Sequence, residues 1–348
     1  MRLLRLLQNP RPFLVLFSLV FGLMGCAEPE YRKIQGETMG TYYATQAAPG
    51  MACDVTAAQL DAVLGDINRS MSTYIQDSEL SLINASSADQ WLPMSSQLIQ
   101  VVEVAEQLWQ QTSGAFDVTV GPLVNLWGFG PEGERSAPSL ESQAQARARV
   151  GMELLRRSDE QLLKTRPGMY IDLSALAKGY AVDRLAQIFM EQGCQDFMVD
   201  IGGEMRMSGV NAQGQLWRIG IEVPDPQAMG MSQDILSVSD ISIATSGDYR
   251  NFHVVNGERV DHVIDPRSGL PADNLVVSAT VLHPSAMWAD AYATALMVMG
   301  MEEGLAFANR MGIPAYLIAR TSLDQHSEQD ALLGFKSRYN EAMGRFLQ

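Results

Sequence analysis

The stretch "MYIDLSALAKGYAVDRLAQIFMEQG", residues 169–193, predicts a strand, a tight turn and a helix. Asp172 stands where the strand would end and the helix begin, and the free backbone N–H groups at a helix start suit an anion. Lys178 follows one turn later, within reach of a phosphate, and Gly179 allows close backbone approach. The spacing is not that of a Walker A loop. An equally good interpretation is an N-cap aspartate with a solvent-facing lysine.

The segments on either side of this stretch indicate the fold class. Helical spacing of apolar residues predicts helices over 56–71 and 95–111, and two more are expected around 285–299 and 302–311. Strand candidates separated by turn residues fill most of 196–283. Because strands and helices interleave without strict βαβ alternation, we expect an α+β fold: mixed sheets with flanking helices, and a more helical N-terminal part.

The N-terminus has the pattern of an export signal. A basic start and a short apolar run end in Leu-Met-Gly before Cys26, which resembles a bacterial lipobox. We therefore expect a signal peptide over 1–25, a lipidated tether over 26–35 and a single domain over 36–348. An ordinary signal peptide or a short membrane anchor is the alternative. Acyl chains on Cys26 would hold the domain to a membrane surface.

Composition narrows the class of protein further. Apolar residues make up 47% and charged residues 19% of the 348 residues, enough for a sizeable core and too few charges for a disordered chain. The formal charge of −15 without a basic patch argues against nucleic-acid binding. An acidic protein must neutralise a phosphate-rich ligand locally. Cys53 and Cys194 could pair in an oxidising compartment, although two unrelated buried thiols are at least as good an interpretation.

Near the C-terminus, "WADAYATAL", residues 288–296, carries two polar residues in apolar surroundings. Asp290 and Thr294 are four residues apart and so share one helix face. A carboxylate and a hydroxyl are hard oxygen ligands of the kind that Mg²⁺ prefers. Taken alone, the pair favours a simpler interpretation, in which Asp290 caps the helix and Thr294 bonds back to its own helix.

Four other segments carry weak signals on their own. "SGAFDVTVGP" (113–122) could present its aromatic ring to a flat ligand or be a strand with that ring in the core. The Gly pair of "DIGGEMRMSG" (200–209) is explained equally well by a bulge or turn. "TSGDYRNF" (245–252) and "HVIDPRSGLP" (262–271) could be surface turns. The histidine that begins the last segment, His262, is a buried structural residue or a candidate general base.

Together these segments resemble the FAD:protein FMN transferases, the ApbE family of flavin-trafficking lipoproteins. The resemblance covers nearly the whole chain after the signal, in order. Its motifs are "GETMGT" (36–41), "MSTY" (71–74), "GAFD" (114–117), "DLSALAKGYAVD" (172–183), "DIGGEMRMSG" (200–209), "ATSGDYRNF" (244–252), "HVIDPRSGLP" (262–271) and "ADAYATAL" (289–296). The resemblance implies an ApbE-type, T-fold-like catalytic domain.

The resemblance also implies which residues bind FAD. Met39 and Tyr74 would contact the dinucleotide. Ala115, Phe116 and Asp117 would line its adenosine end.

Further along the chain, the resemblance places Asp172 and Lys178 near the ribose and phosphates, and the backbone around Ile264 beside the flavin. It implies a Mg²⁺ site of three oxygens, from the side chains of Asp290 and Thr294 and the main chain of Ala175. The family commonly has Gly at the position of Ala175, a change that a main-chain ligand tolerates.

The implied reaction moves FMN from FAD onto a Thr or Ser hydroxyl of an acceptor protein and releases AMP. Positioning and charge neutralisation would do most of the work. His262 is the expected proton acceptor, with Asp248 as a second candidate. The alternatives are a Mg²⁺-dependent FAD pyrophosphatase and a flavin-binding lipoprotein without chemistry. The implied acceptors are subunits of membrane redox complexes, of the sodium-pumping NADH:quinone reductase or Rnf type. We therefore expect the periplasmic side of the inner membrane, with the outer membrane as an alternative.

Overall fold

The computed structural model describes most of the chain after the N-terminal segment. The described residues are 30–50, 53–131, 137–225, 228, 230–248, 252–255, 258–321 and 334–348. The expected signal peptide and Cys26 therefore lie outside the described residues. Within the described ranges, every helix is too short or too polar to span a bilayer.

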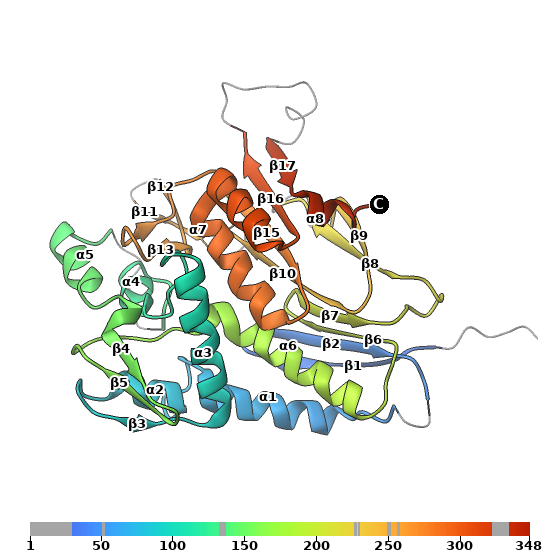
Figure 1. Cartoon of the computed structure of the whole chain (residues 1–348), viewed down its shortest axis with the longest axis horizontal. Helices are drawn as coiled ribbons and strands as arrows, with labels where there is room; N and C mark the ends of the chain where they lie inside the picture. The colour runs from blue at the N-terminus through green and yellow to red at the C-terminus, as the bar shows by residue number, and fades with distance from the viewer. Residues whose placement is uncertain are drawn as a thin grey trace, which may run out of the picture.

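An antiparallel sheet of eight strands forms the centre of the molecule (Figure 1). In spatial order its strands are β1 (Arg32–Thr38), β2 (Thr41–Ala47), β6 (Phe197–Ile201), β7 (Glu204–Ser208), β10 (Ile241–Gly247), β15 (Val276–His283), β16 (Ala315–Arg320) and β17 (Phe335–Tyr339). The α+β class is confirmed. The sheet begins at Arg32, so the folded domain starts before residue 36, where we expected the tether to end.

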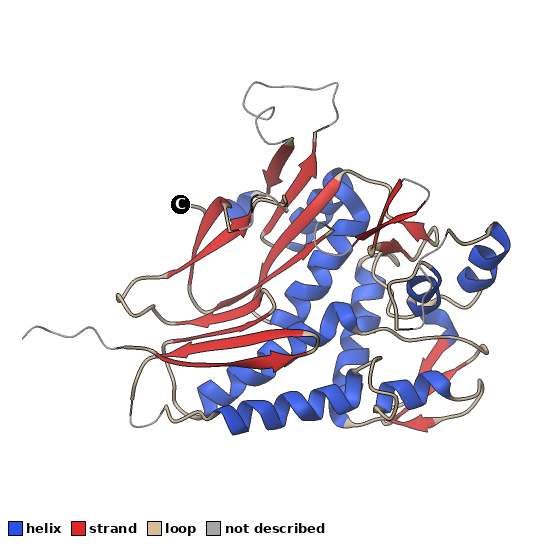
Figure 2. Cartoon of the chain, turned by 180° about the vertical axis from the view of Figure 1, so that it is seen from behind, coloured by secondary structure: helices blue, strands red, loops and turns tan. Residues whose placement is uncertain are grey.

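Helices cover one face of this sheet, as the view from behind in Figure 2 makes clear. The long ones are α1 (Ala57–Met71), α3 (Ser96–Gln111), α6 (Ser174–Glu191) and α7 (Ala286–Met311). The first two match the predicted ranges because their caps are local. Thr56 and Gln59 form a capping box before α1, and the Ser95 hydroxyl accepts the Leu98 N–H before α3.

Helix α7 combines the two helices expected near the C-terminus. Gly300 breaks it, with a φ of 75° that lies outside the helical region. The side chain of Asn274 donates a hydrogen bond of 2.9 Å to the carbonyl of Met297, one turn before the break. A side chain from a neighbouring segment therefore satisfies a carbonyl that the interrupted helix leaves free.

Shorter elements complete the fold. The helical ones are α2 (Glu79–Ala85), α4 (Gly121–Leu126), α5 (Leu140–Arg147), α8 (Glu341–Gly344) and a 3₁₀ turn at Met152–Leu154. The small sheets are β3 (Leu92–Pro93) with β5 (Gln161–Lys164) and β4 (Leu155–Arg157), β8 (Trp217–Glu222) with β9 (Ser232–Val238), β11 (Phe252–Val255) with β12 (Glu258–Asp261), and β13 (Ile264–Asp265) with β14 (Leu270–Pro271). The strand expected before α6 is reduced to one bridge, between Tyr170 and Val120.

Two hydrophobic cores lie on the two faces of the large sheet. The larger one fills the space between the sheet and the long helices. The smaller one joins the other face of the sheet to the β8–β9 hairpin, for example Met207 and Ile243 to Trp217 and Leu236. The sheet is thus covered on both faces, and its inward side chains can be apolar on each.

Helices α6 and α7 are fixed against each other at two points. A Cβ added to Gly179 would lie 2.3 Å from the carbonyl oxygen of Ala286, so only glycine allows this approach. One turn later, the carboxylate of Asp183 accepts hydrogen bonds from the Ser285 hydroxyl (2.6 Å) and from the backbone N–H groups of Ala286 (2.7 Å) and Met287 (3.1 Å). Asp183 therefore caps the start of α7 from the neighbouring helix.

Cys53 and Cys194 form a disulfide, with their Cα atoms 4.8 Å apart. Of the two interpretations that the sequence left open, pairing is the one found. The bond joins the loop before α1 to the segment after α6.

Candidate active site

A cavity of about 530 Å³ opens beside the starts of α6 and β7 and the middle of α7. Eleven of the predicted site residues line it: Tyr74, Ala115, Phe116, Asp117, Asp172, Ala175, Lys178, His262, Ile264, Asp290 and Thr294. These residues come from segments that are far apart in the sequence. The fold brings them to one place.

Two predicted residues are not part of this lining. Met39 lies in the β1–β2 turn with a positive φ of 49° and packs against the larger core. Asp248 is buried at the end of β10, with its carboxylate 3.1 Å from the guanidinium of Arg320. An aspartate held in an ion pair is a poorer candidate for a proton acceptor than His262.

Three charged side chains meet in the cavity wall. The ammonium of Lys178 lies 2.5 Å from a carboxylate oxygen of Glu204. Asp290 accepts the Gly179 N–H at 3.1 Å. Glu204 and Asp290 are only 2% and 3% exposed, so both carboxylates are removed from water.

The charges in this cluster act strongly on one another. Burial lowers the pKa of Lys178, but the carboxylates of Asp290 and Glu204 outweigh burial and raise it. Burial and the charge of Asp290 raise the pKa of Glu204 to about 8, against the opposing effect of Lys178. Burial likewise raises the pKa of Asp290. One ammonium serves two buried carboxylates, so an added positive charge would favour their ionised forms and oppose the rise of both pKa values.

The oxygens expected to bind Mg²⁺ lie around this cluster. Thr294 shares the cavity-facing side of α7 with Asp290, and its hydroxyl is 3.2 Å from the hydroxyl of Ser246. The Gly179 N–H, whose partner in a regular helix is the Ala175 carbonyl, donates to Asp290 at 3.1 Å. Asp290 thus reaches the helical turn that contains Ala175.

The donor set fits a hard divalent cation. Among the described residues, histidines, cysteines and acids form no cluster of three that could hold a metal. A cation here would depend on one carboxylate, one hydroxyl and one carbonyl, leaving positions for water and phosphate oxygens. A cation held by these oxygens would add positive charge beside the two buried carboxylates, which share the single ammonium of Lys178.

Aromatic residues lie in another part of the lining. Phe116 is buried, and the rings of Phe129 and His262 meet edge to face with centroids 6.2 Å apart. Asp117 accepts hydrogen bonds from the Thr119 N–H (2.8 Å) and the Met152 N–H (3.1 Å). Burial raises the pKa of Asp117 and these hydrogen bonds oppose the rise. Asp117 therefore fixes the loop that presents Phe116.

The simpler interpretation of Asp172 and Lys178, an N-cap aspartate with a solvent-facing lysine, does not match the structure. The N-cap of α6 is Leu173, and Asp172 accepts the Ser174 N–H at 2.9 Å from one position earlier. Lys178 lines the cavity and pairs with Glu204, and 32% of its side chain is exposed. Sequence analysis missed Glu204 and Ser246 as lining residues. The available signal was their place in the motifs at 200–209 and 244–252.

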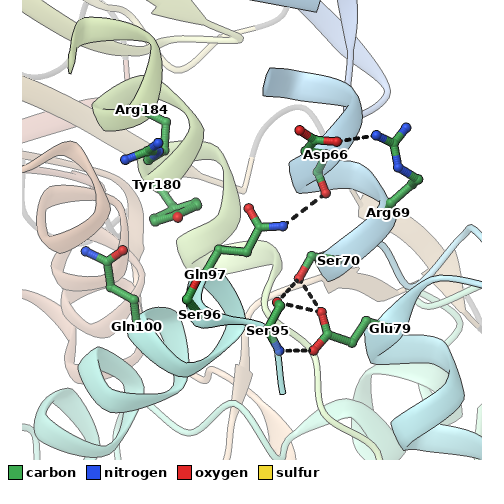
Figure 3. Close-up of a pocket in the computed structure, with 10 residues that line it drawn as sticks. All are labelled: Asp66, Arg69, Ser70, Glu79, Ser95, Ser96, Gln97, Gln100, Tyr180 and Arg184. Carbon is green, nitrogen blue, oxygen red and sulfur yellow. Dashed lines mark hydrogen bonds and ion pairs between the residues drawn. The ribbon is translucent and has the colours of Figure 1, made fainter. Parts of the chain in front are cut away.

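A second depression of similar volume, about 520 Å³, lies between α1, α3 and α6 (Figure 3). Its polar groups are largely paired with one another. Glu79 accepts hydrogen bonds from Ser70 (2.8 Å) and from the Ser95 hydroxyl (2.6 Å), and the Gln97 amide donates to the Asp66 carbonyl (3.2 Å). None of the predicted site residues lines it. The first cavity is therefore the candidate active site.

Comparison with known proteins identifies the family of the chain. The model of the ApbE family matches residues 39–317. A curated relative from Vibrio cholerae, named FAD:protein FMN transferase, is 44% identical over 316 residues, covering 89% of this chain and 94% of the relative. The solved flavin transferase ApbE from Vibrio cholerae superposes with a TM-score of 0.82 at 41% identity, covering 91% of this chain and 99% of that one. The apo flavinyl transferase ApbE from Pseudomonas stutzeri gives 0.81 at 34% identity, covering 91% and 96%.

Proposed function

Because the chain belongs to the ApbE family, we propose that it is an FAD:protein FMN transferase. It transfers FMN from FAD to a Thr or Ser hydroxyl of an acceptor protein and releases AMP, in a reaction that depends on Mg²⁺. The observation that carries this proposal is the single cavity that joins an aromatic region to a buried cluster of Lys178, Glu204 and Asp290. A dinucleotide has matching parts, with flat rings and a diphosphate.

The cavity residues divide the work of binding. Phe116 and its loop receive the adenosine. Lys178 faces the diphosphate, and the neighbouring carboxylates raise its pKa and so keep its ammonium charged. Asp290, Thr294 and the Ala175 carbonyl would hold Mg²⁺. When bound, Mg²⁺ supplies positive charge that stabilises the negative charge developing on the phosphates.

Transfer exchanges one phosphorus–oxygen bond for another. The acceptor hydroxyl oxygen forms a bond to the phosphorus of the FMN half, and the bond from that phosphorus to the AMP oxygen breaks. AMP leaves with the electron pair, and the hydroxyl proton passes to a base.

We assign the base to His262, which lines the cavity, whereas Asp248 is engaged by Arg320. A His262→Asn variant should transfer FMN at least about a hundredfold more slowly near neutral pH. The rise in rate with pH that comes from deprotonation of the imidazole should disappear in this variant. An unchanged rate and profile would remove His262 from this role.

Hydrolysis is the second candidate function, because water in place of the acceptor hydroxyl would make the same site an FAD pyrophosphatase. The protein is incubated with FAD and Mg²⁺, with and without an acceptor domain. We expect FMN that remains on the acceptor through denaturing electrophoresis. Free FMN and AMP with an unlabelled acceptor would favour hydrolysis, and intact FAD would contradict both functions.

The same assay tests the cation. Asp290→Asn should lower labelling by at least about a hundredfold, and chelation should abolish labelling by the wild-type protein. Binding of FAD to the chelated protein, followed by flavin fluorescence, separates loss of chemistry from loss of substrate. Undiminished labelling by Asp290→Asn after chelation would contradict the Mg²⁺ site.

We also propose that the protein works from a membrane surface. Lipidation at Cys26 would anchor it on the periplasmic side of the inner membrane, where acceptor subunits of NADH:quinone reductase or Rnf-type complexes present their hydroxyls. The expected export signal supports this location. Mass spectrometry of such a subunit after coexpression, looking for an added FMN phosphoester, tests the partner.

A further inference from the structure

Glu204 places a buried carboxylate beside the predicted phosphate-binding lysine. It is the first residue of β7 and pairs with Ile201 across the β6–β7 turn. The turn itself is Gly202 and Gly203, with φ values of 62° and 109° that favour glycine. Asp200 accepts the Gly203 N–H at 2.8 Å and holds the turn in shape. The Glu204 carboxylate is therefore held at the cavity by a rigid backbone.

The two oxygens of Glu204 have different surroundings. One lies 2.5 Å from the ammonium of Lys178. The other, Oε2, is buried and has no hydrogen-bond partner among the described residues. Leaving a buried carboxylate oxygen without a donor is costly, and such atoms are retained where a ligand supplies the donor.

The proposed substrate limits what that donor can be. The diphosphate of FAD carries only acceptor oxygens, so it offers no hydrogen bond to Oε2 of the ionised Glu204 carboxylate, the form that the charge of Lys178 favours. Hydroxyl groups on the ribose and ribityl chain flank the diphosphate and can donate. The diphosphate itself complements the ammonium of Lys178. One carboxylate thus has a lysine on one oxygen and a place for a substrate hydroxyl on the other.

We propose that Glu204 is a positioning residue of the transfer reaction: it fixes the ammonium of Lys178 at the diphosphate end of the cavity, and its second oxygen accepts a hydrogen bond from a hydroxyl of bound FAD. This inference rests on the proposed function. Glu204 acts through Lys178, whose charge is needed most when negative charge develops on the departing phosphate. A change at Glu204 should therefore appear mainly in kcat and less in the KM for FAD.

The test is a double-mutant cycle on the full-length protein. Glu204→Gln, Lys178→Met and the double variant are assayed with FAD and Mg²⁺ on an acceptor that the wild-type protein labels. Glu204→Gln should lower kcat about 10- to 100-fold, with the KM for FAD within about threefold. In the Lys178→Met background it should add less than about fivefold, because the route through Lys178 is gone and only the hydrogen bond to the substrate hydroxyl remains. Glu204→Asp, which keeps the charge, should recover part of the rate.

A matched control separates positioning from general stability. Glu79→Gln makes the same chemical change at a carboxylate that binds Ser70 and Ser95 in the other depression (Figure 3). It should leave kcat within about twofold of wild type. Thermal unfolding of each variant shows whether it folds. If Glu204→Gln does not fold, the same kcat and KM measurements are made on Glu204→Asp.

The outcomes are distinct. A wild-type protein that labels no acceptor overturns the proposed function. Wild-type labelling with an undiminished kcat in Glu204→Gln overturns the role of Glu204 alone. Losses that multiply in the double variant overturn its action through Lys178.

Discussion

Gly179 lies where α6 passes closest to α7. The position needs hydrogen as its side chain, because a Cβ would meet the Ala286 carbonyl at 2.3 Å and the Cα of Met287 at 2.6 Å. The Gly179 N–H also donates to Asp290. One residue therefore sets both the helix spacing and the orientation of the expected metal-binding carboxylate.

Gly179→Ala should push α6 and α7 apart. We expect a loss of about 1–3 kcal/mol in the free energy of unfolding, typical of overpacking. We also expect weaker Mg²⁺ binding, so that half-maximal transfer needs a higher Mg²⁺ concentration. Urea unfolding and a Mg²⁺ titration of the labelling rate measure the two effects.

Gly65 in α1 provides the control, since its added Cβ would meet only the end of the Arg69 side chain, at 3.5 Å. Gly65→Ala should stabilise the protein by about 0.5–1 kcal/mol, because alanine is the better helix former. Equal effects at the two glycines would contradict the close-approach account.

At this scale, most of the site residues that the sequence predicted line the cavity. Motif positions such as Asp290 and Lys178 could be identified because each lies in a distinctive segment. Glu204 could not, because its Gly pair predicts a turn without indicating where the next side chain points. Its burial depends on how β7 packs beside α6, which no local pattern contains.

Among the elements, those with local signals were the predictable ones. Helices α1 and α3 follow their caps, Thr56 and Ser95, which are the first residues of the predicted ranges. The strand expected before α6 failed to form because its backbone at Tyr170 finds only Val120 as a bridge partner. Strand formation needs a neighbour from elsewhere in the chain, so a β-like pattern is not sufficient.

The disulfide connects elements that the sequence could not place together. Reduction should lower the free energy of unfolding by about 2–5 kcal/mol, because the bond closes a loop across a separation of 141 residues. Urea unfolding with and without dithiothreitol measures this. Cys53→Ser is the control and should show the lower stability in both conditions. Identical midpoints for the wild-type protein with and without reductant would contradict the prediction.

Over the whole molecule, the α+β class followed from the interleaved strand and helix patterns, but the strand order did not. The large sheet places β10 between β7 and β15, and such non-local pairing depends on packing at both faces. The cavity is a product of that order, since it joins the turn before β7 to the end of β10 and to α7.

Anchoring is a property of the whole molecule. Cells supplied with labelled palmitate should incorporate it into the wild-type protein and not into Cys26→Ser, which should appear in the soluble periplasmic fraction. Cys53→Ser, whose cysteine lies in the folded domain, should still be labelled. Label retained by Cys26→Ser would contradict lipidation at this residue.

The start of the sheet at Arg32 has a consequence for such an anchored enzyme. Five residues lie between Cys26 and this strand, and a fully extended chain from Cys26 to Arg32 reaches only about 20 Å. The first strand of the catalytic domain would then lie within about 20 Å of the lipid surface. Acceptor proteins whose hydroxyl groups lie too far from the bilayer would not reach the active site. Distance from the bilayer would therefore help to select which proteins receive a flavin.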